Sequence, residues 1–259
     1  MNAVDRHLSV PGARLRYRDE GAGPAVVFVH GWTLDLDMWD PQEPLAACLR
    51  LVRYDRRGFG LSSGEASTHG DVEDLRALIS ELALVKPLLV GMSQGARVVL
   101  EFALRYPSHA GGLLLDGAPP CTQSDLPMAL FRETARRDGI DAFRRLWADH
   151  PLTQLVTGEP AIHALRARML ARYRGTDLLS RDPEKLDALP EEALAQIRVP
   201  VRIVNGECDV DTRKHSGRTL HGALAESEIL VVANAGHMPN LDAPDDYNRI
   251  VSEFTGREE

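Results

Sequence analysis

The chain has 259 residues, of which 44% are hydrophobic and 26% are charged, and its formal net charge is −8. This length and composition are typical of one globular domain with a large buried core. The negative charge would repel a phosphate backbone, so we expect no nucleic-acid partner.

The amino-terminal residues and the apolar runs argue against export and against membrane binding. Residues 1–10 carry Asp5, Arg6 and His7 and lack the apolar core of a signal peptide. Apolar runs such as residues 25–29 are far shorter than the roughly 20 residues that span a bilayer. We therefore expect a cytoplasmic protein without a membrane partner.

The three cysteines, Cys48, Cys121 and Cys208, are widely spaced and include no CxxC pair. This spacing indicates neither a disulfide framework nor a zinc site, and we expect no metal. We interpret Cys208 as a small buried side chain, although it lies beside a candidate site residue, Asp209.

Short apolar runs alternate with longer helical patterns along most of the chain. Several of these runs are continuous and bounded by Gly or Pro, as expected for parallel strands that are buried on both faces. The predicted strands are residues 14–19, 25–30, 49–55, 87–91, 112–116, 201–205 and 228–233.

Helical patterns lie between the predicted strands. Leu75, Leu78 and Leu82 recur at helical spacing, and either Thr68 or Asp71 is a candidate for the amino-terminal cap of that helix. Alternation of strands and helices predicts an α/β fold, with a mainly parallel sheet and helices on both of its faces.

Residues 119–199 break the alternation, because no strand pattern occurs there. Two sets of apolar residues repeat at helical spacing: Ile140, Phe143 and Trp147, and then Ile162, Leu165, Met169 and Tyr173. We therefore expect residues 1–118 and 200–259 to form the core, and residues 119–199 to form a helical cap over one edge of it.

The predicted cap is rich in arginine. Its arginines include Arg132, Arg136, Arg137, Arg144, Arg145, Arg166, Arg168, Arg172 and Arg174. We interpret them as a solvated helical surface, with anion binding as the alternative.

The pentad GMSQG, residues 91–95, has Ser93 at its centre. It follows a predicted strand and opens a helical pattern, residues 94–106, that is apolar almost all round. In this setting a GxSxG pentad places the serine on a tight turn, where glycine at the outer positions avoids a steric clash. The turn holds the hydroxyl at the carboxyl edge of the sheet, beside the positive end of the helix. We predict that Ser93 is the catalytic nucleophile of a hydrolase.

A serine hydroxyl needs a general base, and the base needs an acid that orients it. His237 lies in the turn between the last predicted strand and a final helical pattern at residues 242–254, which places it on the same sheet edge as Ser93. His30 ends a strand on that edge and is interpreted below. We interpret the remaining histidines as surface residues: His7, His69, His109, His150, His163, His215 and His221.

Asp209 is our candidate for the acid of the triad. It enters a loop after the predicted strand at residues 201–205. The order Ser93, Asp209, His237 along the chain is the order expected for this triad on a doubly wound sheet. The acids that remain open as alternatives are Glu207, Asp211 and Asp116.

The tetrahedral intermediate of acyl transfer needs backbone N–H donors for its oxyanion. Gln94, directly after the nucleophile, is expected to supply one donor, and Trp32 the other, with Thr33 as the alternative. The Trp32 ring is expected either to wall the substrate pocket or to pack in the core. His30 is expected to pin this loop by side-chain hydrogen bonds.

Together these motifs resemble the α/β-hydrolase superfamily. The resemblance rests on residues 30–32 (HGW), 54–62 (YDRRGFGLS), 91–95, 206–209 (GECD) and 236–237 (GH). It is greatest to the compact branch of small carboxylesterases, enol-lactonases, haloperoxidase-like perhydrolases and C–C bond hydrolases. The serine at the turn separates the chain from the branches that use an aspartate nucleophile.

The resemblance implies an α/β-hydrolase fold: a mostly parallel eight-stranded sheet flanked by helices, with a helical cap inserted after the sixth strand. It also implies the triad Ser93, Asp209 and His237. The sequence departs from the family pattern at residues 210–212 (VDT), where many relatives have a proline. This departure leaves the shape of that loop, and the choice of acid, open.

We expect a serine hydrolase that cleaves a small carboxylic ester or lactone without a metal or an organic cofactor. The alternatives are C–C bond hydrolysis of a β-diketone-type substrate, perhydrolysis with the same triad, and a ligand receptor on the same fold. A carboxylate-bearing substrate should meet an inward-facing cap arginine. An apolar ester should instead meet Phe131, Phe143, Trp147 or Met169. The sequence does not predict the oligomeric state.

Overall fold

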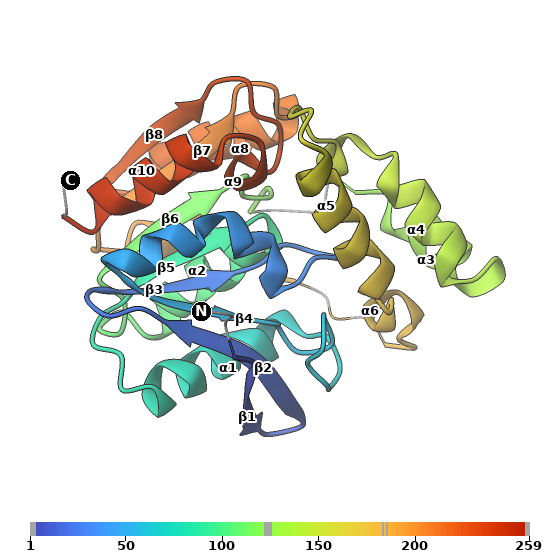
Figure 1. Ribbon diagram of the computed structural model, residues 1–259, viewed down its shortest axis with the longest axis horizontal. Helices are drawn as coiled ribbons and strands as arrows, with labels where there is room; N and C mark the ends of the chain where they lie inside the picture. The colour runs from blue at the N-terminus through green and yellow to red at the C-terminus, as the bar shows by residue number, and fades with distance from the viewer. Residues whose placement is uncertain (1–3, 122–125, 183, 185, 257–259) are drawn as a thin grey trace.

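The computed structural model describes residues 4–121, 126–182, 184 and 186–256. Its centre is an eight-stranded sheet in the order β1-β2-β4-β3-β5-β6-β7-β8 (Figure 1). The strands are β1 (Arg6–Val10), β2 (Ala13–Glu20), β3 (Ala25–Val29), β4 (Arg50–Tyr54), β5 (Leu88–Met92), β6 (Gly112–Asp116), β7 (Val201–Gly206) and β8 (Ser227–Val232). The pairs β1–β2 and β2–β4 are antiparallel, and all other neighbouring strands are parallel. The expected mostly parallel, eight-stranded sheet is confirmed.

The first strand, β1, is absent from the strands that the sequence pattern predicts. It lies at the edge of the sheet, and three of its five residues are exposed. An edge strand with the sequence RHLSV buries too little apolar surface to show the continuous run on which the other predictions rest. Its position is fixed by pairing with β2, from Arg6 opposite Tyr17 to Val10 opposite Ala13.

Each face of the sheet is covered by its own set of helices, because successive side chains of a strand point to opposite faces. In β3, Val27 and Val29 pack in the core formed with α1 (Thr68–Glu81), α2 (Gln94–Arg105) and α8 (Asp211–Ala223). Val26 and Phe28 pack on the other face. The elements covering that face are η1 (Leu36–Ala47), α9 (Pro239–Asp242) and α10 (Pro244–Phe254).

Two details of the predicted helices need correction. The cap of α1 is Ser67, whose hydroxyl accepts a hydrogen bond from Gly70 N at 3.0 Å, and neither Thr68 nor Asp71 has this role. Asp71 instead lies buried and pairs with Arg56. The last predicted helix, residues 242–254, is α10, which begins at Pro244 because the residue before a proline cannot readily adopt helical backbone angles, and Asp242 instead ends the separate short helix α9.

Four helices from the predicted cap gather beside the sheet, on the right in Figure 1. They are α3 (Met128–Arg137), α4 (Ile140–Ala148), α5 (Pro160–Arg172) and α6 (Thr176–Leu179), with the short turn η2 (Pro151–Thr153) between α4 and α5. The later helix α7 (Glu191–Leu194) packs differently, since Leu194 and Ile197 belong to the core under the sheet. The boundaries of the cap at residues 119 and 199 stay a prediction.

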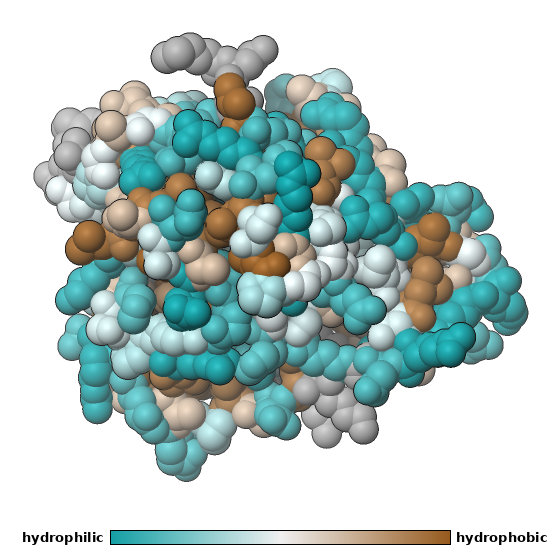
Figure 2. Space-filling model, turned by 90° about the horizontal axis from the view of Figure 1, so that it is seen from below, coloured by the Kyte–Doolittle hydropathy of each residue, from teal (hydrophilic) through white to brown (hydrophobic). Residues whose placement is uncertain are grey.

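The surface carries hydrophobic side chains in small separate groups. The face seen in Figure 2 is largely hydrophilic, with a few brown groups between charged side chains. Within the described part of the chain, no helix has the length and apolar character needed to cross a bilayer.

Candidate active site

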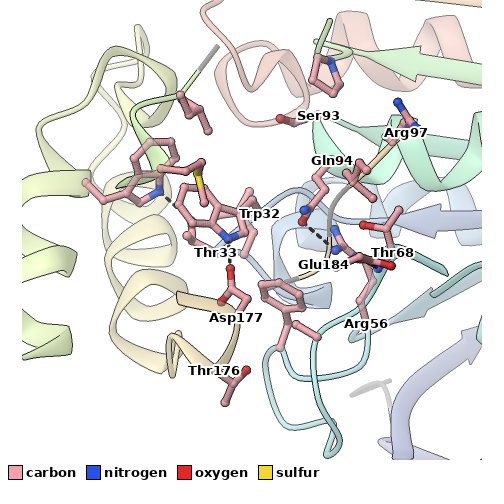
Figure 3. Close-up of a pocket in the computed structure, with 18 of the residues that line it drawn as sticks. Trp32, Thr33, Arg56, Thr68, Ser93, Gln94, Arg97, Thr176, Asp177 and Glu184 are labelled. Atoms are coloured by element: carbon pink, nitrogen blue, oxygen red, sulfur yellow. Dashed lines mark hydrogen bonds between the residues drawn. The ribbon is translucent and has the colours of Figure 1, made fainter. Parts of the chain in front are cut away.

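Ser93 lies on the turn between β5 and α2, at the wall of a large pocket (Figure 3). Its backbone angles are φ 51° and ψ −117°, a strained conformation for a residue with a side chain. Its N–H donates to the Asp116 carbonyl at 2.7 Å, and its own carbonyl accepts from Ala96 N at 2.9 Å. These bonds help to hold the turn in its strained shape.

The glycines on either side of Ser93 are required by close packing. A Cβ atom on Gly91 would lie 2.5 Å from the Gly95 carbonyl oxygen, and one on Gly95 would lie 2.2 Å from the Val29 carbonyl oxygen. Real Cβ atoms do not approach backbone so closely, so only glycine fits at both positions. The strand-turn-helix context that the pentad indicates is confirmed.

His237 comes from the loop between β8 and α9 and lines the same pocket as Ser93. Its Nδ1 atom lies 3.0 Å from Asp209 Oδ2, and both side chains are buried. Asp209, in the loop between β7 and α8, also accepts a hydrogen bond from Val210 N at 2.7 Å. An imidazole that donates from Nδ1 leaves Nε2 free to act as a base.

Glycine also sets the position of the His237 ring. Gly117 has a φ of +52°, and a Cβ atom there would lie 2.7 Å from His237 Cε1. The ring therefore packs directly on the backbone that follows β6. This contact fixes the ring from the side, while Asp209 fixes it through Nδ1.

The alternative acids lie in different surroundings. Asp211 is fully exposed and pairs with Lys214 at 3.2 Å, and Glu207 accepts a hydrogen bond from Asn234 N. Asp116 is fully buried, and its carboxyl group interacts with the buried hydroxyl of Tyr247. Burial, with the charge of Asp209, raises the pKa of Asp116 well above its usual range, which favours its neutral form. Of the acids considered, Asp209 hydrogen-bonds to His237.

His30 has the structural role that the sequence predicts. Its Nδ1 donates to the Gly31 carbonyl at 2.8 Å, and its Nε2 accepts from Arg56 N at 2.9 Å. Burial and the nearby Arg56 charge lower the pKa of His30 well below its usual value, so the ring is neutral. This ring joins the loop after β3 to the loop after β4 and thereby fixes the backbone at Trp32.

Trp32 and Gln94, whose backbone N–H groups are the expected oxyanion donors, both line the pocket. Gln94 is the first residue of α2, so its backbone N–H has no acceptor within the helix. The loop that carries Trp32 lies close to the nucleophile, since a Cβ atom on Gly31 would be 3.4 Å from Ser93 Cβ. Thr33 is held differently, with a φ of 66° and its hydroxyl accepting from Trp147 Nε1. The two donor roles stay predictions.

The Trp32 ring both lines the pocket and packs in a cluster. It contacts the rings of Phe131, Phe143, Trp147 and Tyr173. Its Nε1 donates to Asp177 Oδ2 at 2.7 Å, a link between core and cap that is drawn in Figure 3. No motif in the sequence singles out Asp177, because its role depends on a residue 145 positions away.

The pocket has a volume of about 1490 Å³ and is walled by both core and cap. Of the four apolar cap residues expected to meet an apolar ester, only Trp147 lines it, together with Leu126, Met128, Leu152 and Leu170. Phe131 and Phe143 pack in the aromatic cluster around Trp32, and Met169 packs in the core below η1. Trp147 is therefore the one of these four alternatives that the described structure places at the pocket wall, since helical spacing marks a buried face without showing which cavity the face borders.

The cap arginines are not uniformly a solvated surface. Arg172 is bidentate to Asp35, with two contacts of 2.8 Å, and Arg174 donates to the carbonyls of Gly60 and Ser62. Both therefore join the cap helices to the core. The interpretation as a solvated surface fits exposed residues such as Arg137, Arg145 and Arg168.

Cys208 is exposed, so the interpretation of this residue as a small buried side chain was wrong. Its backbone N–H donates to the Ala235 carbonyl at 2.8 Å, so the contact of this residue with the loop of His237 is through its main chain. The side chain is not a buried filler.

Comparison with known proteins agrees with this geometry. Residues 26–250 match the model of the alpha/beta hydrolase family. A Bacillus subtilis (strain 168) protein, provisionally named a 2-succinyl-6-hydroxy-2,4-cyclohexadiene-1-carboxylate synthase, is 29% identical over 94% of this chain and 95% of its own. A pimeloyl-[acyl-carrier protein] methyl ester esterase of Nitrosospira multiformis is 26% identical over 88% of this chain and 92% of its own.

Among solved structures, the enol-lactonase from Burkholderia xenovorans LB400 has the same fold. It superposes with a TM-score of 0.84 at 22% identity and covers 97% of this chain and 100% of its own. Because the family model matches most of the sequence, this chain belongs to the alpha/beta hydrolase family.

Proposed function

We propose that this protein is a serine hydrolase that cleaves a small carboxylic ester or lactone, with Ser93 as nucleophile, His237 as base and Asp209 as orienting acid. One observation carries the proposal. His237 is hydrogen-bonded through Nδ1 to the buried Asp209 and lines the same pocket as Ser93. An imidazole oriented in this way by a carboxylate can act as the base for a serine hydroxyl in the same pocket, which supports the proposal.

In the proposed reaction, His237 Nε2 takes the Ser93 proton as Oγ attacks the ester carbonyl. Asp209 keeps the imidazole in the correct tautomer and stabilises the imidazolium that forms. His237 then returns the proton to the departing alcohol, which leaves an acyl group on Ser93. Water, activated by the same histidine, hydrolyses the acyl-enzyme and regenerates the serine.

The negative oxygen of the tetrahedral intermediate would be held by the backbone N–H groups of Gln94 and Trp32. Two features support this role. Gln94 opens α2, so its N–H belongs to the positive end of a helix. The loop of Trp32 is pinned by the neutral ring of His30, which gives the second donor a fixed position.

The name of the Nitrosospira relative, an ester esterase, agrees with carboxylic ester hydrolysis. C–C bond hydrolysis, perhydrolysis and ligand reception on the same triad would use a different substrate in the same pocket. A screen of aryl esters, aliphatic lactones, a vinylogous diketone and peracid formation separates these activities. Covalent modification of His237 without steady-state turnover would favour a receptor.

The direct test is Ser93→Ala, assayed on an aryl ester that the wild type hydrolyses. We expect kcat to fall by several orders of magnitude, since members of a triad act as a unit. Ser108→Ala is the matched control, because Ser108 is exposed and its hydroxyl hydrogen-bonds to the neighbouring His109. Near-normal turnover by Ser93→Ala would refute the proposal.

A further inference from the structure

The charged side chains that line the pocket differ in how they are neutralised. Three of the four arginines of its core wall, Arg56, Arg57 and Arg97, form ion pairs within the chain, and the fourth, Arg213, is fully buried in α8. The respective partners of the first three are Asp71, Asp74 and Glu101. The positive charge of these three guanidinium groups is therefore already compensated by carboxylates of the chain.

Arg166, which projects from α5 in the cap, is not compensated in this way. It lines the pocket, and within the described structure its one hydrogen bond is from Nη1 to the Thr153 carbonyl, at 2.6 Å. Its Nε atom is buried without a hydrogen-bond partner. The negative charge of Asp149 raises the pKa of Arg166. Asp149 is exposed, however, and no ion pair joins the two side chains in the described structure.

The acids that line the pocket do not supply the missing negative charge to Arg166. Asp177 accepts hydrogen bonds from Trp32 Nε1 and from the Tyr173 hydroxyl. Glu184 binds the first N–H groups of α1, as seen beside Thr68 in Figure 3. The remaining two acids, Glu65 and Asp182, are exposed.

A partly desolvated guanidinium is costly unless an anion compensates it. Burial lowers the pKa of Arg166, in keeping with that cost. The planar fork of arginine matches a carboxylate, to which it can donate two parallel hydrogen bonds. The pocket is also larger, at about 1490 Å³, than the 300–1,000 Å³ or so of ordinary small-ligand sites. It has room for a substrate that extends from Ser93 into the cap.

We propose that Arg166 binds a carboxylate at the far end of the substrate, so that the enzyme prefers esters or lactones that carry a second, anionic group. This inference rests on the proposed hydrolase function and adds the substrate class. In it, Arg166 is a specificity residue. It holds the acyl chain with its ester at Ser93 and takes no part in bond breaking.

The kinetic test compares monomethyl adipate with methyl hexanoate, two esters that differ in the terminal carboxylate. We expect the wild type to have the higher kcat/KM for monomethyl adipate. Arg166→Met should lower the ratio of the two kcat/KM values by about 10- to 100-fold, the effect of losing a charged hydrogen-bonded contact. The change should fall mainly on KM, because the contact is made equally in the ground state and the transition state.

Arg168→Met is the matched control, since Arg168 lies on the same helix, is exposed and does not line the pocket. It should leave the ratio unchanged. Arg166→Lys keeps the charge without the fork and should lie between wild type and Arg166→Met. Arg132 also lines the pocket, with a buried Nε atom that has no hydrogen-bond partner. A larger fall in Arg132→Met than in Arg166→Met would place the anion on α3 and overturn the assignment.

A binding experiment separates this inference from the proposed function. Adipate, the product from monomethyl adipate, is titrated into the Ser93→Ala variant by calorimetry. We expect saturable binding that weakens about tenfold or more when Arg166→Met is added, and that is unaffected by Arg168→Met. Hydrolysis of both esters at equal kcat/KM, or adipate binding that is independent of Arg166, would overturn the inference and leave the hydrolase intact. If the wild type hydrolyses neither these esters nor any aryl ester or lactone of the screen, the proposed function fails, and the calorimetric result alone decides the anion site.

Discussion

The carboxyl edge of the sheet and the helical cap place their polar groups by different means. At the sheet edge, Ser93, Asp209 and His237 follow three strands, and backbone geometry and buried hydrogen bonds fix them. In the cap, polar groups are held by single long side chains that reach across to the core, as Arg172 and Arg174 do. The sheet edge is therefore suited to hold reacting groups in fixed positions. The cap is suited to change the side chains that contact the substrate.

The largest expected effect at the sheet edge, after loss of Ser93 itself, is that of Asp209→Asn. An amide accepts poorly from the Nδ1 proton and favours the wrong imidazole tautomer, so kcat should fall by about 10⁴. Steady-state kinetics on an aryl ester measures it. Asp211→Asn, at an exposed acid, should be silent. A comparable loss in Asp211→Asn, or none in Asp209→Asn, would assign the acid elsewhere.

Asp116→Asn sharpens the same comparison. Because burial raises the pKa of Asp116 and so favours its neutral form, an amide of the same shape should leave kcat within a few-fold of wild type, unlike Asp209→Asn. A loss as large as that of Asp209→Asn would mean that Asp116 carries the charge that stabilises His237. The pH profile of kcat/KM for the two variants makes the distinction.

Gly117→Ala tests how tightly the edge fixes the His237 ring. The added methyl would lie 2.7 Å from Cε1 and should displace the ring, lowering kcat by about 10- to 100-fold. Gly139→Ala is the matched control, since it also has a positive φ but no atom within 4 Å of the new Cβ. The control should cost about 1 kcal/mol of stability with kcat retained. Equal kinetics in both variants would show that the contact does not position the ring.

The smallest effect is expected in the cap, from Arg172→Met. Burial and neighbouring Asp55 raise the pKa of Asp35 to about 7, and Arg172 opposes that rise. An acid whose pKa is raised on folding binds more protons in the native state, so its contribution to stability falls between about pH 4 and pH 7. Removing Arg172 should steepen this fall. We expect a loss of about 1–3 kcal/mol at pH 8 and a smaller loss at pH 5.

Urea unfolding of Arg172→Met and wild type at the two pH values measures this difference. Arg168→Met, on an exposed side of the same helix, serves as control and should show no pH-dependent loss. A loss that is the same at pH 5 and pH 8 would indicate that Arg172 acts by packing instead of by charge.

The sequence by itself determined the parts of the molecule whose constraints are local. Gly91 is required by its contacts with Gly95 and Ala96, a few residues along the chain, and buried parallel strands need continuous apolar runs, so both are visible as patterns. His30 could be assigned to the loop because its partners lie at strand ends that the topology brings together.

The tertiary structure alone decided what depends on distant segments. The edge strand β1 carries no strong pattern and is fixed by its partner, and the cap of α1 depends on which hydroxyl reaches Gly70 N. Helical spacing marked Phe143 and Met169 as buried but not which space they border. Arg166 is the arginine of α5 that lines the pocket with a buried Nε atom lacking a hydrogen-bond partner in the described structure, and the sequence around it does not predict which arginine of the helix takes that position.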